Sequence, residues 1–145
     1  MKKSNVTKVY ITTDGYFTDR SDIKKRRVVA VLEQRNSDGA VAVVKVFSKE
    51  GKEANIGKTF IPGLTLLPQD HSTLTQESIV GRQVQFGVKH ADKTYTPIFL
   101  SDMVATEDRL TRSELRRIRK EVHNDTRQHR KTYKDKKKKW QKSFK

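Results

Sequence analysis

The sequence contains no cysteine, and this absence excludes several kinds of chemistry. Without a thiol the chain has no disulfide scaffold, no thiolate metal site and no cysteine nucleophile. No apolar run approaches the roughly 18 residues that cross a bilayer, so we expect no membrane-spanning segment and no membrane partner. Residues 1–4 have the charge of a signal peptide, but polar residues interrupt any apolar region after them. We therefore expect a cytoplasmic protein.

Motifs for metal ions and nucleotide cofactors are also missing. The four histidines form no H-E-x-x-H pair, and the phosphate-binding patterns G-x-x-x-x-G-K-[ST] and G-x-G-x-x-G do not occur. Three aspartates between residues 14 and 22 lack the glycine and the terminal glutamate of a calcium loop. The sequence thus predicts no metal site and no cofactor.

Positive charge is abundant, and it is unevenly placed. The 145 residues include 32 Lys+Arg against 17 Asp+Glu, for a formal net charge of +15. Residues 109–145 carry a net charge of +12, and residues 1–108 only +3. Such a concentration favours a polyanionic partner, so we expect RNA, with DNA as an alternative. An acidic protein partner would also fit this charge, as would a tail that only aids solubility.

Short apolar runs separated by turn residues predict a mainly β body at residues 1–108. Asn36–Gly39 predicts a hairpin turn, and Pro62-Gly63 predicts a bent or edge strand. Six such strands in so short a body indicate an α+β fold, mainly β, with a small curved sheet or barrel. The modest core makes a homodimer an additional expectation. The expected strands are 6–12, 24–33, 41–47, 59–67, 84–88 and 95–100.

A helix is predicted at residues 109–123. Thr111 and Glu114 match the two ends of a capping box, and Leu110 and Leu115 occupy the hydrophobic-staple positions. Apolar residues then recur at helical spacing, which predicts an amphipathic helix docked on the body. Residues 124–145 form a basic extension, within which a second helix is possible. There Tyr133, Trp140 and Phe144 would share a face, either to pack against protein or to stack on bases.

Two clusters of cationic and hydroxyl side chains flank neighbouring predicted strands. Residues 24–27 precede the strand with the longest apolar run, and Ser48-Lys49 follows the next. Metal-free RNA cleavage uses the ribose 2′-OH as nucleophile, so the protein must stabilise charge on the phosphate and assist proton transfer. Arg26 can bind the phosphate, and a hydroxyl such as that of Ser48 can donate to a phosphate oxygen. The alternative is that both clusters are solvated strand ends.

The order of these motifs resembles the MazF/PemK family of toxin endoribonucleases. Arg26–Val29 is similar to the Arg-Pro-Val-Val that opens a strand in that family, and Val43–Ser48 is similar to its strand ending in a Thr-Ser corner. Ser78–Val80 and Leu110–Leu115 are similar to its Ser-Val-Val strand and its helix cap. The resemblance covers residues 6–122.

This resemblance implies an SH3-like, MazF-like barrel and metal-independent cleavage of single-stranded RNA. It implies a catalytic role for Arg26, and for Ser48 at the position of the family's threonine. It also implies a dimer restrained by a cognate antitoxin protein. Arg27 stands where the family has proline.

Two functions follow from the sequence: an RNA-binding endoribonuclease of this type, or a non-catalytic nucleic-acid-binding module. The nuclease would use Arg26 and Ser48 as catalytic residues. Either function would bind the nucleic acid through basic residues of both clusters and of the C-terminal region. The candidate binding residues are Lys24, Lys25, Arg27, Lys49, Arg116, Arg119, Lys120, Arg127, Arg130, Lys131, Lys136, Lys137 and Trp140.

Overall fold

The computed structural model describes residues 8–12, 28–35, 37–86, 88–89, 95–128, 130–131, 134–135 and 137–138. Its longer strands are β1 (Lys8–Thr12), β2 (Val28–Gln34), β3 (Val41–Ser48), β4 (Ser78–Val80) and β7 (Met103–Arg109). A two-stranded ribbon consists of β5 (Val88–Lys89) and β6 (Tyr95–Thr96). Two 3-10 turns, η1 (Glu53–Asn55) and η2 (Leu100–Asp102), precede the helix α1 (Arg112–Gln128).

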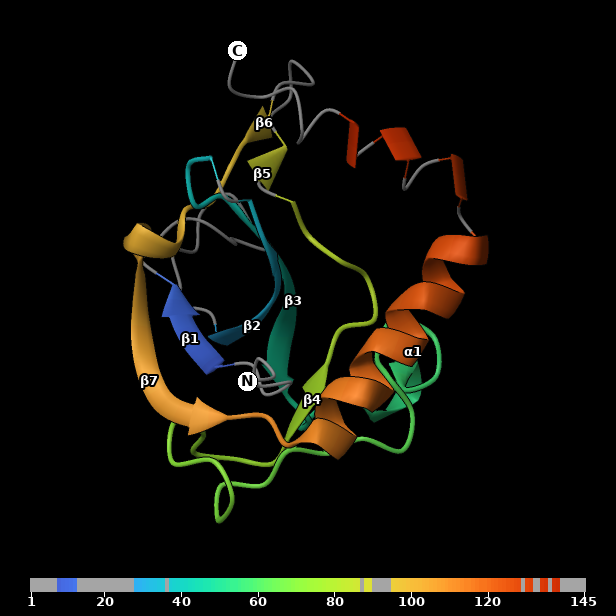
Figure 1. The fold of residues 1–145 in the computed structure, drawn as a ribbon. Coiled ribbons are helices and arrows are strands. Elements are labelled where there is room, and N and C mark those ends of the chain that lie inside the picture. The colour runs from blue at the N-terminus through green and yellow to red at the C-terminus, as the bar shows by residue number, and fades with distance from the viewer. Residues whose placement is uncertain are drawn as a thin grey trace.

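The main sheet has the strand order β4-β3-β2-β1-β7, with every neighbouring pair antiparallel. It is strongly curved, and α1 lies alongside β4 (Figure 1). Within the described residues β4 and β7 are the edges and do not pair with each other, so the sheet is not closed into a barrel. The predicted α+β, mainly β fold with a C-terminal helix is therefore confirmed, but the barrel is not.

The turn between β2 and β3 forms where the sequence predicts it. Gly39 has a φ of 79°, a conformation that glycine adopts without steric cost, and its amide donates to the Arg35 carbonyl at 2.9 Å. The guanidinium of Arg35 donates to both carboxylate oxygens of Asp38, which lowers the pKa of that carboxyl. The predicted residue Asn36 lies outside the described part of the chain.

Three predicted strands differ from the structure. Residues 59–67 form only isolated bridges, from Phe60 to Gly81 and from Leu66 to Ser78. Pro62 and Gly63, the latter with a φ of 69°, interrupt the extended backbone between these bridges. The predicted pair 84–88 and 95–100 is replaced by two-residue strands, β5, which shares only Val88 with the first prediction, and β6, at the start of the second.

Both faces of the sheet are buried, because alternate residues of β2 and β3 point in opposite directions. Ala30 and Val44 pack with Ile118 of α1 in the larger core cluster. On the other face Val29 and Val43 pack with apolar residues of the segment 98–103. The central strands are therefore continuous apolar runs rather than alternating ones.

The capping box of α1 is confirmed. The Glu114 amide donates to Thr111 Oγ1 at 3.1 Å, and the Thr111 amide donates to Glu114 Oε1 at 2.8 Å. Leu110 and Leu115 are both buried, as the staple requires. The other carboxylate oxygen of Glu114 lies 3.2 Å from Nε2 of the buried His71. The start of the helix is thus fixed both locally and by a contact with the body.

The helix is longer than the docked segment expected at 109–123, since it continues through Asn124 and Asp125 to Gln128. Beyond it, the described residues 130–131, 134–135 and 137–138 also have helical backbone. None of the helices in the described part of the chain has both the length and the apolar composition needed to cross a bilayer.

Candidate nucleic-acid interface

Ser48, a predicted catalytic residue, is the last residue of β3 and pairs with Ser78 of β4. Its hydroxyl donates a hydrogen bond of 2.6 Å to Oε1 of Gln76. The other predicted catalytic residue, Arg26, and the neighbouring Lys24, Lys25 and Arg27 lie outside the described residues. The structure therefore positions only one member of the predicted catalytic pair.

Lys49 lies beside a shallow cavity of about 510 Å³ at the end of β3. The other lining residues are Gln76 and three glutamates, Glu50, Glu53 and Glu77. Three carboxylates against one ammonium repel the phosphates of a nucleic acid. This cavity does not suit the RNA-binding role predicted for Lys49.

A different cavity, of about 470 Å³, lies where β3 meets the segments 58–60 and 81–85. We call it the aromatic pocket, because Phe47 and Phe60 both line it. Their ring centroids are 5.2 Å apart at an interplanar angle of 71°, an edge-to-face arrangement. The ammonium groups of Lys45 and Lys52 lie 5.5 and 5.9 Å from the Phe47 centroid. The aromatic surface is therefore surrounded by positive charge.

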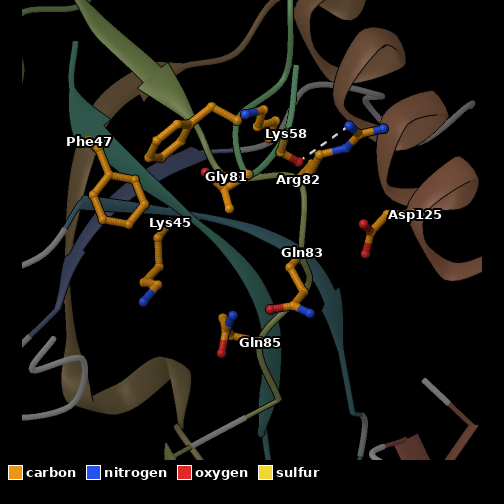
Figure 2. A pocket seen from close by; sticks show the side chains of 10 residues that line it. Lys45, Phe47, Lys58, Gly81, Arg82, Gln83, Gln85 and Asp125 are labelled. Atoms are coloured by element: carbon orange, nitrogen blue, oxygen red, sulfur yellow. Dashed lines mark hydrogen bonds between the residues drawn. The ribbon is translucent and has the colours of Figure 1, made fainter. Parts of the chain in front are cut away.

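Two glutamines supply hydrogen-bonding groups to the aromatic pocket. Residues 83–86 alternate in exposure, so that Val84 and Phe86 are buried while Gln83 and Gln85 line the pocket. Figure 2 shows Lys45, Gln83 and Gln85 around the same opening. Neither glutamine side chain is hydrogen-bonded to another described residue. Their amides are available to a ligand.

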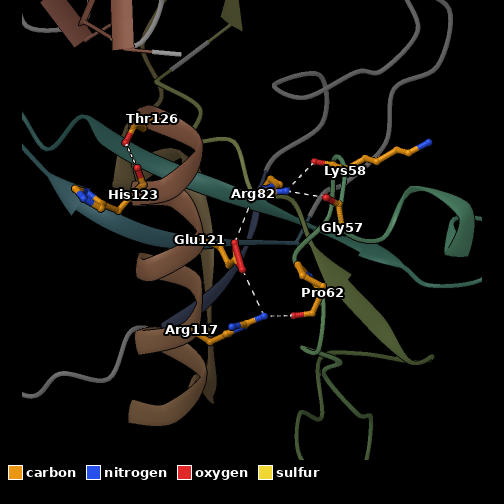
Figure 3. A network of polar contacts seen from close by, with 8 residues as sticks. All are labelled: Gly57, Lys58, Pro62, Arg82, Arg117, Glu121, His123 and Thr126. Atoms are coloured by element: carbon orange, nitrogen blue, oxygen red, sulfur yellow. Dashed lines mark hydrogen bonds and ion pairs between the residues drawn. The ribbon is translucent and has the colours of Figure 1, made fainter. Parts of the chain in front are cut away.

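Arg82 forms one wall of the aromatic pocket and is held by several contacts (Figure 3). Its Nη1 donates to the carbonyls of Gly57 and Lys58 at 2.8 and 3.3 Å. Its Nη2 lies 3.3 Å from the carboxylate of Glu121, a buried residue of α1. The guanidinium is thus fixed in place before any ligand binds, which lowers the entropic cost of binding.

Glu121 also connects α1 to the segment 57–62 through a second arginine. Its second carboxylate oxygen lies 3.4 Å from Arg117, whose guanidinium donates to the Pro62 carbonyl at 2.7 Å. One buried carboxylate therefore joins two arginines that each bind backbone carbonyls of the segment 57–62. This network holds the helix against the wall of the aromatic pocket.

On the other side of Arg82 lies a second cavity, of about 410 Å³, which we call the arginine cleft. Arg82, Asn124, Arg127 and Arg130 line it, with no carboxylate among them. Arg127 and Arg130 are two of the predicted binding residues, and the structure brings them together with Arg82, which no sequence motif indicates. The guanidinium groups of Arg127 and Arg130 are suited to bind phosphate, while that of Arg82 is already paired with Glu121.

The remaining predicted binding residues that the structure describes do not line either of these cavities. Arg116, Arg119 and Lys120 are exposed on α1, and Lys131 is exposed beyond it. The ammonium of Lys137 lies 3.8 Å from Glu33, at the end of β2. Lys136 and Trp140, with the stacking expected of Trp140, lie outside the described residues.

No titratable cluster in the described part of the chain suits a metal ion, since no group of three or more His, Asp or Glu side chains converges there. Asp108 is buried and its pKa is lowered, but its carboxylate binds the segment 72–73 and does not line either cavity of the interface. The groups at the interface are instead cationic, aromatic and amide side chains. This set can bind a polyanion that also carries flat rings.

Comparison of the chain with protein-family models, with curated proteins and with solved structures finds no match. The resemblance to the MazF/PemK family therefore has no support from these comparisons. The geometry of the interface is the remaining basis for assigning a function.

Proposed function

We propose that this protein binds single-stranded RNA through the aromatic pocket and the arginine cleft. The observation that carries the proposal is their contiguity, because Arg82 lines both. The aromatic pocket offers a surface on which a base can stack, and the cleft offers guanidinium groups for the phosphates on either side of that base. Single-strand binders combine these two features.

The charge of the interface supports the same proposal. Three cationic residues, Lys45, Lys58 and Arg82, line the aromatic pocket against one carboxylate, that of Asp125. The adjoining cleft adds Arg127 and Arg130. A duplex would keep its bases stacked and inaccessible to the pocket, whereas unpaired RNA presents them.

The test is fluorescence anisotropy of a labelled RNA strand titrated with the full chain at several salt concentrations. Replacing Arg127 and Arg130 by alanine should weaken binding and lower the dependence of log K on log[salt] by about 1.4, since each phosphate contact with a single strand contributes about 0.7. The matched control is Arg109→Ala with Arg112→Ala, which removes the same charge from two exposed positions, the last residue of β7 and the first of α1.

Equal losses of affinity in the two double variants would mean that only net charge matters, and would contradict the proposal. So would the absence of RNA binding at physiological salt. Single-stranded DNA of the same sequence forms the comparison ligand, and tighter binding of DNA would assign the interface to DNA instead.

The second candidate function is metal-independent RNA cleavage by Arg26 and Ser48. One observation favours it: Val28, two residues after Arg26, pairs with Val46, two residues before Ser48. The two chain segments therefore approach the same end of the sheet. The SH3-like barrel, the homodimer and the cognate antitoxin implied by the MazF/PemK resemblance belong to this candidate.

The cleavage candidate is tested by incubating the purified protein with mixed-sequence RNA in EDTA. A nuclease should give fragments with a shared end motif, and Arg26→Ala with Ser48→Ala should abolish them. Intact RNA, or equal cleavage by the double variant, would exclude this mechanism and leave the binding function unaffected.

A further inference from the structure

We infer that the aromatic pocket is a subsite for adenine, recognised by Gln83 and Gln85. The inference rests on the proposed function, because it assigns the base that the RNA strand places in the pocket. Charge and stacking alone do not distinguish the bases, so this subsite would give the binding surface a sequence preference.

The backbone that carries the two glutamines is fixed. The Gln85 amide donates to the Val43 carbonyl at 2.7 Å, and the Val43 amide donates to the Gln85 carbonyl at 2.9 Å. Val84 and Phe86 anchor the same segment in the core cluster around Ala40 and Ala42. The pairing with Val43 fixes the backbone of Gln85, and Gln83 lies two residues earlier in a bend next to the buried Val84.

The chemistry of a primary amide matches one edge of adenine. A glutamine side chain has an acceptor oxygen and a donor nitrogen side by side, and adenine presents its amino group beside a ring-nitrogen acceptor. The two groups form a bidentate pair. Guanine presents two adjacent acceptors on its corresponding edge, to which one amide can donate only a single hydrogen bond.

The aromatic surface favours a purine over a pyrimidine. Phe60 is buried and meets Phe47 edge to face, so a base would stack on the Phe47 ring, and a bicyclic base covers more of that ring than a monocyclic one. Uracil and cytosine can also pair with an amide, so the distinction from them depends on this larger stacking area. Adenine satisfies both requirements at once.

The phosphates of the same strand have a defined place. Arg82 lines both the aromatic pocket and the arginine cleft, so a base held by the glutamines has a phosphate site directly beside it. The Arg82 guanidinium is already held by Gly57, Lys58 and Glu121. Base selection and phosphate binding are thus separable, the first by Gln83 and Gln85 and the second by Arg127 and Arg130.

The experiment uses the full chain and labelled uridine strands of about 12 nucleotides, within the span that single-strand-binding domains cover. In three of the strands every third base is replaced by adenine, guanine or cytosine. The adenine strand should bind about tenfold more tightly than the all-uridine and cytosine strands, the discrimination expected of one bidentate base contact. It should also bind more tightly than the guanine strand.

Replacing both Gln83 and Gln85 by alanine should reduce the adenine preference to within about twofold while leaving the salt dependence unchanged, because no phosphate contact is lost. The matched control is Gln69→Ala, at an exposed glutamine that does not line either cavity of the interface. Gln85→Glu serves as a second variant of nearly the same size, which accepts hydrogen bonds but donates none. It too should lose the adenine preference.

Equal affinity for all four strands would overturn the adenine subsite and leave RNA binding intact. A preference for guanine would also overturn it, because the cations rather than the glutamines would then recognise the base. No binding to any strand would overturn both the subsite and the proposed function. An adenine preference that survives in both glutamine variants would contradict the assigned residues.

Discussion

Asp108 is a buried carboxylate near the end of β7 that binds the segment after His71. The amide and the hydroxyl of Ser72 both donate to its Oδ1 at 3.0 Å, and the amide of Thr73 donates to its Oδ2. Burial disfavours the charged form, but these hydrogen bonds favour it more strongly, so the pKa of Asp108 lies below its usual value of 3.8. One side chain thus anchors a loop that has no strand of its own.

Replacing Asp108 by asparagine should destabilise the protein by about 1–3 kcal/mol at neutral pH, because the amide nitrogen faces a backbone donor and one buried hydrogen bond is lost. Since the folded state lowers the pKa, the carboxylate stabilises the protein fully above the unfolded value of 3.8. That contribution is lost as the pH falls through the lower folded pKa. Urea unfolding at a series of pH values should show the difference between wild type and variant shrinking in acid.

Asp70→Asn is the control for this measurement, since Asp70 is an exposed carboxyl in the same loop. It should unfold at nearly the wild-type urea concentration. If the difference in unfolding free energy between wild type and Asp108→Asn stayed constant down to the lowest pH, ionisation of Asp108 would not contribute to stability.

At the scale of the element, contacts of its first turn stabilise the start of α1. The capping box satisfies two backbone amides that would otherwise lack a partner, and Glu114 extends the same contact to His71. The apolar residues Leu115 and Ile118 then secure the docked face. The capping box and the apolar spacing are local in sequence, which is why the helix and its cap could be predicted, whereas the contact with His71 is long-range and could not.

Thr111→Ala should lower the free energy of unfolding by about 1 kcal/mol, because it removes the side-chain acceptor for the Glu114 amide. Urea denaturation monitored by circular dichroism gives the value. Ser113→Ala provides the comparison, at an exposed position in the same turn, and alanine's better helix propensity should leave stability equal or slightly higher. If both variants lost the same stability, the loss could not be assigned to the cap.

The strands differ in how well sequence predicts them, and the reason is burial. β2 and β3 lie at the centre of the sheet with both faces covered, so their apolar runs stand out. β7 is an edge strand whose Val104 is 50% exposed, and it mixes apolar with charged residues. Its extended form depends on pairing with β1, a long-range contact that leaves little trace in local composition.

At the scale of the whole molecule, the interface also depends on long-range contacts that local sequence patterns do not predict. Arg127 and Arg130 could be proposed from charge alone, but Arg82, which lines the same cleft, comes from a segment far earlier in the chain. No motif marks Gln83 and Gln85, although their alternation with Val84 and Phe86 is a strand-like signal. What sets them opposite Lys45 is the pairing of Val43 with Gln85, and no local pattern encodes it.

The strand order also determines when the sheet can be completed during synthesis. β1, the first described strand, lies between β2 and β7, and β7 is the last of the described strands. During synthesis β2 and β3 can form their hairpin early, but one edge of β1 stays without a partner until residues 103–109 have left the ribosome. Closing so long a loop is also slow for an isolated chain. Until then β1 is an edge of the nascent sheet, the position that β7 takes in the finished fold.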